Sequence, residues 1–262
     1  MPELPEVETE RRYLDAHARH QRVTGVRAPH PDVLSGTSAQ SLSRRLKGHT
    51  VESSRRHGKY LFAGFDSGDW LAMHFGMTGS LKYYRHDSKP PEYIAVLLLL
   101  EGGHDLAYLS RRRLGRIALI TDPDAFIAAR KLGVDALEIK AAQFRELLIS
   151  GRAAVKPRLM DQGRIAGIGN EYSDEILFQA RIHPARSTTS LSQRESEALY
   201  RAMRTVLKKA IAVRADPGRM PSSWLYTNRS KGARCPVCGG PVGTLSAGGR
   251  TAYYCPKCQP RR

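Results

Sequence analysis

The chain has 262 residues, with 42 Lys and Arg against 25 Asp and Glu, so its formal charge is +17. This length is enough for two ordinary domains, and such a charge favours a polyanionic partner, either nucleic acid or a membrane surface. The longest apolar run covers residues 94 to 100, which is much too short to span a bilayer. The acidic N-terminus lacks the apolar core of a secretory signal. These features exclude a membrane-spanning protein and predict a cytosolic protein that binds nucleic acid.

The first ten residues, MPELPEVETE, contain two prolines and four carboxylates. Pro5 suits a first helical turn, and acidic side chains there face the positive end of the helix dipole. We therefore predict a helix from about residue 3 to about residue 18. A plain capped helix explains most of this pattern.

The proline behind the initiator methionine allows a second interpretation. If Met1 is removed, Pro2 presents a secondary amine, and an α-amino group titrates near ~8, so part of it is an uncharged nucleophile at neutral pH. Glu3 is its neighbour, and Glu6 would share a helical face with Glu3. A nucleophile and a proton donor would then lie side by side.

Short alternating stretches follow the predicted helix, separated by Gly, Pro, Asp and Ser. The candidate strands are residues 22–28, 50–54, 60–65, 71–74, 93–100, 105–109 and 116–120. Many short strands with turn signals between them indicate a sandwich or barrel rather than a parallel sheet. We expect residues 1 to about 134 to form a β-rich domain that begins with one helix.

Three loops between these strands could contact DNA. Lys59 follows Arg55-Arg56-His57-Gly58, which favours a phosphate contact, although a solvated charge cluster is an equal alternative. Met77 lies in a loop with two glycines and could insert into a base stack, or simply fill the core. Core packing explains Leu114, but it does not explain the four arginines around it, which include Arg112.

From about residue 135 the pattern becomes helical, with helices predicted at 141–149, 156–160 and 171–180. A longer helix follows the capping box Ser192-x-x-Glu195. Asn170 is the predicted N-cap of the third of these helices. The glycines before it, Gly167 and Gly169, could let backbone N–H groups approach an anion, or could form an ordinary turn.

The C-terminal segment carries the most specific motif. All four cysteines, Cys235, Cys238, Cys255 and Cys258, fall in two Cys-x2-Cys pairs separated by sixteen residues. This is the usual spacing of a four-thiolate zinc site, which is closed and therefore structural; two disulfides are the alternative. The strand-like stretch 250–254 before the second pair indicates a zinc-stapled β-hairpin, with Arg250 placed to deliver a guanidinium to a phosphate.

Together these motifs resemble the Fpg/Nei family of DNA glycosylases, and most closely its formamidopyrimidine-DNA glycosylase branch. The resemblance rests on PELPEVE at the start, GKYL at residues 58–61, MHFGMTGSL at 73–81, AGIGNEYSDEILF at 166–178, IHP at 182–184 and the four-cysteine hairpin. It implies a multidomain α+β fold: an N-terminal helix plus β-sandwich (1–134), a helical helix–two-turns–helix domain (135–230) and a C-terminal zinc hairpin (231–262). It further implies one structural Zn²⁺, a monomer in a bacterial cytoplasm, and duplex DNA with a damaged base or abasic site as the partner.

The resemblance also implies roles for individual residues. Pro2 would attack C1′ of an everted nucleotide and form a Schiff base, Glu3 would donate a proton during base removal, and Glu6 would support Glu3 or hold the N-terminus. Lys59 and Arg250 would bind flanking phosphates and act in the β- and δ-eliminations. The other residues implied to contact DNA are His74, Met77, Arg112, Leu114, Arg152, Lys156 and Asn170. The implied activity is that of a bifunctional glycosylase and AP lyase, with a non-catalytic zinc-containing protein that binds damaged DNA as the alternative.

The chain departs from the family pattern at three places that affect lesion choice. A histidine-containing hairpin of the family has no clear counterpart around residues 89–93. Leu114 stands where the family commonly has an aromatic residue, so stacking on the neighbouring base should be weaker. Residues 215–234 are short and lack the usual lesion-capping sequence. Formamidopyrimidine and 8-oxoguanine lesions therefore both remain candidate substrates.

Overall fold

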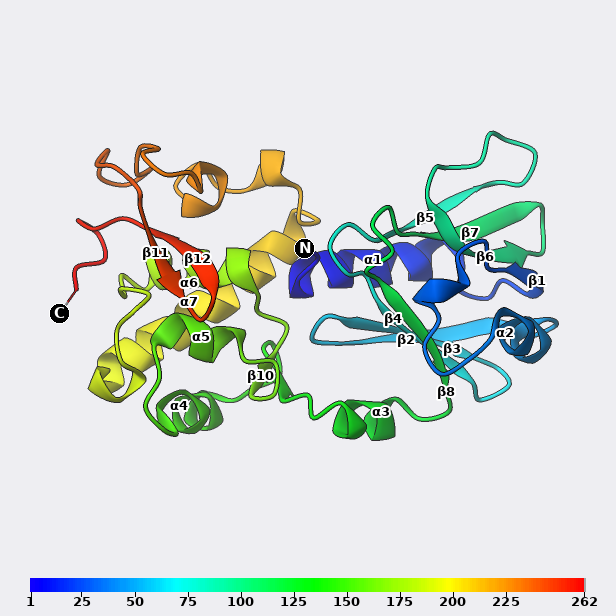
Figure 1. The fold of residues 1–262 in the computed structure, drawn as a ribbon, viewed down its shortest axis with the longest axis horizontal. Coiled ribbons are helices and arrows are strands. Elements are labelled where there is room, and N and C mark those ends of the chain that lie inside the picture. Colours follow the sequence, from blue (N-terminus) through cyan, green and yellow to red (C-terminus); the bar gives the residue numbers. More distant parts are fainter. Residues whose placement is uncertain (262) are drawn as a thin grey trace. The chain divides into compact units, whose positions relative to one another are not determined.

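A computed structural model describes residues 1–261 (Figure 1). The chain divides into two compact units. Unit 1 contains Met1–Pro2 and Glu6–Arg130, and unit 2 contains Glu3–Pro5 together with the chain from Lys131 onward. Among the described residues, no helix combines the length and the apolar character that crossing a membrane requires.

Unit 1 is built from helix α1 (Leu4–His17), of which it contains all but the first two residues, and two four-stranded antiparallel sheets (Figure 1). One sheet has the order β1 (Val23–Arg27), β6 (Ile94–Leu100), β7 (His104–Leu109) and β5 (Ser80–Arg85). The other has the order β2 (Val51–His57), β3 (Tyr60–Phe65), β4 (Trp70–His74) and β8 (Arg116–Ile120). The short elements are η1 (Pro31–Val33), α2 (Ala39–Leu46) and α3 (Pro123–Ala129).

The core of unit 1 lies between its two sheets. Leu61 and Met73 from one sheet and Leu98 and Leu106 from the other belong to a single buried cluster, which Leu14 of α1 joins. In β3, for example, Leu61, Ala63 and Phe65 belong to this core, whereas Phe62 belongs to a second cluster on the other face of the strand. The predicted helix-led sandwich is confirmed.

Four elements of unit 1 were not predicted from the sequence: β5, η1, α2 and α3. Strand β5 buries only Leu81, so it carries no apolar run. Helix α2 is short and buries only Leu42 and Leu46, and α3 begins at Pro123 behind its N-cap Asp122. Short elements with one or two buried side chains give little periodicity to detect.

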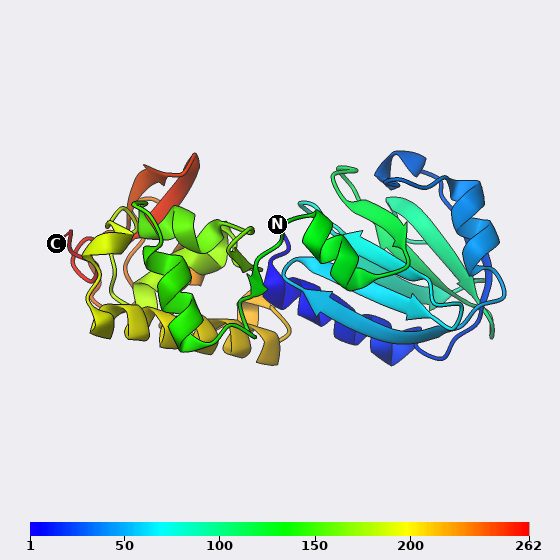
Figure 2. The same ribbon diagram turned by 90° about the horizontal axis from the view of Figure 1, so that it is seen from below.

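Unit 2 is mainly helical and ends in a hairpin. Its helices are α4 (Ala141–Ile149), α5 (Val155–Met160), α6 (Asn170–Gln179) and α7 (Gln193–Ala212), with η2 (Thr188–Ser190), η3 (Pro217–Arg219) and η4 (Leu225–Asn228) between or after them. Two-residue strands β9 (Val134–Asp135) and β10 (Ile165–Ala166) pair in parallel, and β11 (Gly243–Ala247) pairs with β12 (Arg250–Tyr254). Figure 2 shows the hairpin and α7 on opposite sides of the intervening helices, and α6 contacts both.

The main core of unit 2 lies between α6 and α7. Tyr172 and Ile176 of α6 pack with Leu199, Met203 and Leu207 of α7, and all five side chains are buried. The predicted capping box of α7 is present, with both of its hydrogen bonds formed. The predicted N-cap of α6 is wrong by one residue: Gly169 is the N-cap, and Asn170 is already helical.

The hairpin β11–β12 has a small core of its own. Phe178 of α6 and Leu225 of η4 pack there with Val242, Cys235 and Cys255. Gly248 and Gly249 form the turn between the strands, both with positive φ, which matches the twist of a two-residue hairpin. The hairpin is thus fixed to the helical part of unit 2.

Candidate functional site

The carboxylate of Glu3 caps the start of helix α6. It accepts hydrogen bonds from the backbone N–H groups of Gly169 (2.6 Å), Glu171 (2.8 Å) and Tyr172 (3.4 Å). The side chain is only 2% exposed, and the N–H of the next residue, Leu4, donates to the carbonyl of Gly167 at 3.0 Å. The backbone N–H groups in the first turn of a helix have no acceptor within the helix. At the start of α6 the Glu3 carboxylate is that acceptor.

The glycine before α6 makes this capping possible. A Cβ on Gly169 would collide with the Glu3 carboxylate, and a Cβ on Gly167, whose φ is +116°, would collide with Leu4. These glycines therefore let the N-terminal segment approach the backbone closely. Because α1 begins at Leu4, Glu3 is the residue directly before the helix, and the helical face that Glu3 would share with Glu6 remains a prediction.

Met1, Pro2 and Glu6 retain exposed surface, whereas Leu4 is buried. Met1 is 40% exposed, Pro2 is partly exposed, and Glu6 is half-buried in the first turn of α1. Pro2 is one peptide bond from Glu3, so a fixed Glu3 carboxylate limits where the Pro2 nitrogen can lie.

Lys156 lies beneath the start of α6 rather than on a surface. Its ammonium donates to the carboxylate of Asp174 and, at 3.1 Å, to the backbone carbonyl of Asn170, and the side chain is 0% exposed. Burial lowers the pKa of Lys156, and the Asp174 carboxylate opposes that shift. The position corrects the expected DNA contact of Lys156, since an ammonium without exposed surface supports the α6 start instead.

Asn170, Arg250 and Arg152 occupy more open positions in unit 2. The Asn170 Oδ1 atom is buried and has no hydrogen-bond partner among the described residues. Arg250 is exposed where β12 begins, immediately after the hairpin turn, and Arg152 is exposed in the loop before α5. The two arginines are therefore open to a ligand, whereas the Asn170 Oδ1 atom is a buried acceptor.

Lys59 is held in the tight turn between β2 and β3. Gly58, with a φ of +55°, and Lys59 connect His57 directly to Tyr60 across the hairpin. The Lys59 side chain is only 8% exposed. The alternative of a freely solvated charge cluster therefore does not hold for Lys59, whose cation is fixed at the end of the sheet.

His74, at the end of β4, is neutral at physiological pH. Burial lowers the pKa of His74 to about 4, and the cations of Lys59, Arg130 and Arg116 contribute further. Its Nδ1 accepts a hydrogen bond from the N–H of Gly76 at 3.2 Å. The ring proton is therefore on Nε2, which leaves a neutral donor for a phosphate oxygen.

Met77 and Leu114 are presented by two loops that touch each other. Gly76, with a φ of +59°, lies so close to the other loop that a Cβ there would be 2.6 Å from the backbone N of Gly115. Met77 is 40% exposed and Leu114 46%, and Arg112 is exposed as well. Core packing, the alternative considered for both apolar residues, is therefore wrong, and two large apolar side chains lie exposed on adjoining loops.

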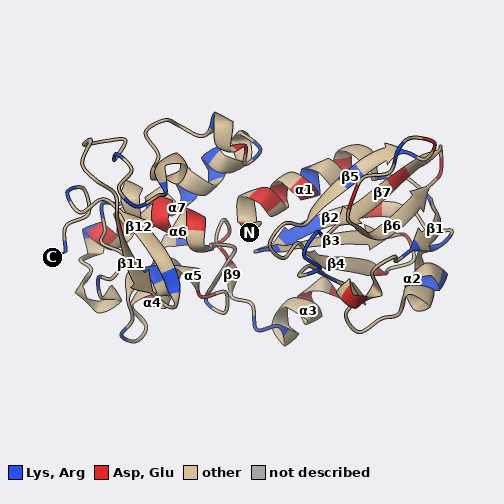
Figure 3. Ribbon diagram, turned by 45° about the horizontal axis from the view of Figure 1, so that its top comes forward, with Lys and Arg blue, Asp and Glu red and all other residues tan. Residues whose placement is uncertain are grey.

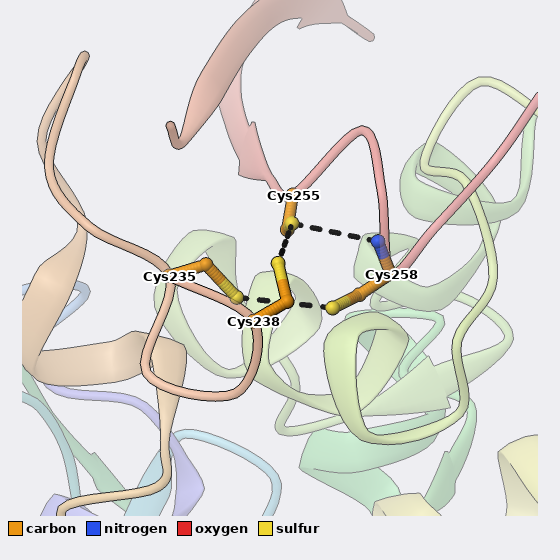
Figure 4. Close-up of side chains that lie close together, drawn as sticks. All are labelled: Cys235, Cys238, Cys255 and Cys258. Carbon is orange, nitrogen blue, oxygen red and sulfur yellow. Dashed lines mark hydrogen bonds between the residues drawn. The ribbon is translucent and has the colours of Figure 1, made fainter. Parts of the chain in front are cut away.

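The four cysteines converge at one point. Figure 4 shows their sulfur atoms turned toward one another, with Cys235 and Cys238 on one loop and Cys255 and Cys258 at the end of the hairpin. The Sγ atoms of Cys235 and Cys258 are 3.8 Å apart, those of Cys238 and Cys255 are 3.4 Å apart, and all four lie within 4.8 Å. Tetrahedral Zn²⁺ with Zn–S bonds of about 2.3 Å requires sulfur separations of about 3.8 Å, so the cluster fits one structural Zn²⁺. Disulfide pairing is not needed to explain it.

Lys and Arg are spread over the helices, strands and loops of each unit, with Asp and Glu interleaved (Figure 3). The positive charge is therefore not confined to one motif. It gives both units a general attraction for polyanions.

Comparison with known proteins identifies the family. Three family models cover most of the chain: the formamidopyrimidine-DNA glycosylase N-terminal domain (residues 1–117), the formamidopyrimidine-DNA glycosylase H2TH domain (132–221) and the zinc finger found in FPG and IleRS (232–261). The chain is 37% identical to the formamidopyrimidine-DNA glycosylase of Pelotomaculum thermopropionicum, over 99% of each protein. It is 36% identical to that of Arabidopsis thaliana, over 99% of this chain and 71% of the plant protein.

Solved structures agree with these matches. A complex of LlFpg with THF-DNA and an inhibitor has a TM-score of 0.90 at 28% identity, over 99% of this chain and 100% of the other. Lactococcus lactis Fpg bound non-covalently to DNA containing an AP site has a TM-score of 0.89, also at 28% identity and with the same coverage. The fold and the four-cysteine hairpin are those of a zinc-finger DNA glycosylase. This chain belongs to the formamidopyrimidine-DNA glycosylase family.

The sequence analysis missed several contacts around these residues. The cap of α6 by Glu3 joins residues 166 positions apart, and the Asp174 carboxylate that pairs with Lys156 also binds Arg229. The hydroxyl of Tyr108 donates to the carbonyl of His74 at 2.8 Å. Local periodicity carries no signal for such contacts, although buried charges on α6 could have suggested partners.

Proposed function

We propose that this protein is a bifunctional DNA glycosylase and AP lyase that removes oxidised bases of the formamidopyrimidine or 8-oxoguanine type from duplex DNA. The observation that carries this proposal is the Glu3 carboxylate, held by the N–H groups of Gly169 and Glu171 one peptide bond from Pro2. A binding protein needs no such fixed carboxyl group beside a proline amine.

The chemistry follows from a secondary amine at the chain terminus. After loss of Met1, the Pro2 nitrogen attacks C1′ of the damaged nucleotide, the C1′–base bond breaks, and the base leaves with a proton from Glu3. The Pro2 nitrogen then loses its proton and the C1′–O4′ bond opens, with O4′ taking up a proton, so that C1′ and the nitrogen form an iminium. The iminium is an electron sink, so a proton is lost from C2′ and the 3′ C–O bond breaks in β-elimination. δ-Elimination then breaks the 5′ C–O bond, and water releases the enzyme from the sugar fragment.

The remaining site residues bind and bend the DNA in this proposal. Lys59 and Arg250 contact phosphates that flank the damaged nucleotide and assist the eliminations. Asn170, His74 and Arg152 contact the backbone nearby. Extruding a base costs a few kcal/mol, which the apolar side chains of the wedge offset by filling the gap. The wedge consists of Met77, Arg112 and Leu114.

Further parts of the proposal concern organisation. The catalytic domain covers residues 1–134, the helix–two-turns–helix domain 135–230 and the zinc hairpin 231–262. The protein acts as a monomer on damaged duplex DNA in the cytoplasm of a bacterial-type cell. The three family models support the division into domains, and the DNA-bound structures of the relatives support damaged DNA as the partner.

The first test is covalent trapping. Mixed with a duplex containing an abasic site and borohydride, the purified protein should form a reduced Schiff-base adduct, and the N-terminal peptide should begin at Pro2 by mass spectrometry. Pro2→Gly, which replaces the pyrrolidine by a primary amine, should lose most of the adduct. Absence of an adduct from protein that begins at Pro2 would favour the non-catalytic damaged-DNA binder.

A further inference from the structure

Arg229 connects three parts of unit 2. It lies just after η4, in the short segment that lacks a lesion-capping sequence. Its Nη2 and Nε donate to Asp174 Oδ2 of α6 at 2.9 and 3.2 Å, and Nη2 also reaches the carbonyl of Asn170 at 3.4 Å. The side chain is 14% exposed, so these contacts are largely shielded from water.

The same guanidinium stacks on the zinc hairpin. Its Cζ lies 5.0 Å from the centre of the Tyr253 ring, in strand β12. Arg250 opens that strand three residues earlier. The hairpin turn is also seated on α5, since a Cβ on Gly248 would be 2.9 Å from Pro157. Arg229 therefore supports the hairpin at Tyr253 in β12, and Pro157 supports it at the turn.

We propose that Arg229 is a positioning residue that fixes the Arg250-bearing strand relative to the Asn170 end of α6. This inference rests on the proposed function, because it assigns a purpose to the spacing between Arg250 and Asn170. A phosphate clamp works only if its groups are held at a constant separation, and a free hairpin would pay the ordering cost at each binding event. Because Arg229 already holds the hairpin against α6 in the free protein, this loss of conformational entropy does not have to occur when DNA binds.

Arginine is suited to this position and lysine is not. A planar guanidinium can donate two hydrogen bonds to one carboxylate oxygen and a neighbouring carbonyl while its face rests on an aromatic ring. The Asp174 carboxylate already pairs with Lys156, so its second oxygen is available to Arg229. An ammonium at residue 229 would keep the charge but lose the stacking plane.

A double-mutant cycle tests the inference. Affinity would be measured with full-length, zinc-loaded protein on a short duplex containing a tetrahydrofuran abasic-site analogue, which cannot be cleaved. We expect Arg229→Ala and Arg250→Ala each to weaken binding about tenfold, and the double variant to be about as weak as either single variant, because both act through one clamp. Arg229→Lys should fall between wild type and Arg229→Ala. Arg234→Ala, an exposed arginine of the same segment, is the matched control and should bind like wild type.

Two outcomes would overturn the inference: wild-type affinity in Arg229→Ala, or a loss of about a hundredfold in the double variant, which would mean independent effects. If Arg229→Ala loses zinc or fails to fold, Tyr253→Leu removes the stacking ring and keeps an apolar side chain against the hairpin core. It should show the same coupling to Arg250→Ala, and additive losses there would reject the role. The cycle uses an analogue without chemistry, so it stands even if covalent trapping fails. Failure of the proposed activity and failure of the positioning role are thus separate results.

Discussion

The carboxylate of Glu3 accepts a 2.6 Å hydrogen bond from the backbone N–H of Gly169, 166 residues later in the chain. This contact fixes the N-terminal segment at the start of α6. The carboxylate gives the helix terminus a hydrogen-bond partner, and in the proposed mechanism it also holds the proton donor in a fixed position.

Glu3→Gln should separate the two chemical steps. Base excision from a lesion duplex should fall by at least about a hundredfold, because proton transfer by a positioned acid typically contributes 10²–10⁴-fold. Borohydride trapping on an abasic site should persist, because no base has to leave. The free energy of unfolding should fall by about 1 kcal/mol, since an amide N–H₂ would face backbone donors. Equal loss of excision and trapping would contradict the assigned role.

Gly169→Ala should disrupt the same contact from the opposite side. The new methyl group would occupy the space of the Glu3 carboxylate, so we expect destabilisation of about 1–3 kcal/mol and loss of base excision. Denaturant unfolding and a single-turnover excision assay measure the two effects. Gly218→Ala is the control, because its Cβ would have only an ordinary 3.4 Å contact with the Asp216 side chain. Wild-type excision in Gly169→Ala would show that the close approach is unnecessary.

Glu175 should make stability depend on pH. Burial raises the pKa of Glu175 from 4.5 to about 7, and its carboxylate accepts from the N–H of Tyr226 at 2.8 Å and from the Gln179 amide at 2.6 Å. A raised pKa means that the folded state holds the proton more tightly. Protonated Glu175 therefore stabilises the folded state. This contribution to the free energy of unfolding is fully present below about pH 4.5 and is lost as the pH rises through about 7. It amounts to about 3 kcal/mol at most.

Glu175→Gln tests this dependence. A glutamine can accept from Tyr226 with its oxygen and donate to Gln179 with its nitrogen, so the fold should be preserved. The difference in unfolding free energy between variant and wild type should shift in favour of the variant between pH 5 and pH 8. Taking the difference removes the contribution of Glu10, whose pKa burial also raises to about 7. A difference that is constant with pH would rule out titration of Glu175 in this range.

Leu114→Phe should strengthen binding to duplex DNA that lacks one base. Leu114 is 46% exposed, so a larger side chain meets no packing penalty, and an aromatic ring stacks on a base with about 1–3 kcal/mol. We expect affinity for a tetrahydrofuran duplex to rise severalfold and Leu114→Ala to lower it, with unchanged melting temperatures. Unchanged affinity in both variants would remove Leu114 from the wedge.

Cys255→Ser should release the zinc ion and loosen the hairpin. Cys255 is fully buried in the small core around Phe178, so both the metal and its packing are lost. Zinc content should fall below one ion per chain, and cleavage of abasic DNA should be abolished. Thermal unfolding should still show the transition of unit 1, whose sheets contain none of the four cysteines. Retained zinc with full activity would refute the four-thiolate site.

Local sequence determined several features of this protein without help from tertiary structure. Strands β3 and β8, helix α4 and strand β12 match their predicted bounds, because alternating or helical periodicity and flanking turn residues act within a few positions. The Cys-x2-Cys spacing predicted the zinc site, since two close pairs on one hairpin can converge on a metal. The order and combination of motifs along nearly the whole chain were sufficient to identify the family.

Tertiary structure decided how the site residues are used. Lys156 looks like a DNA contact in the sequence but lies fully buried against Asp174, whereas Leu114 looks like a core residue and is exposed. Glu3 acquires its position from Gly169, and Arg229 from Asp174 and Tyr253. These partners are far apart in the sequence. Whether a side chain is buried depends on which other segments of the chain pack against it, and not on the residues next to it in the sequence. Hydrophobic periodicity depends only on residues within a few positions of one another. Contacts between distant segments are therefore seen only in the tertiary structure.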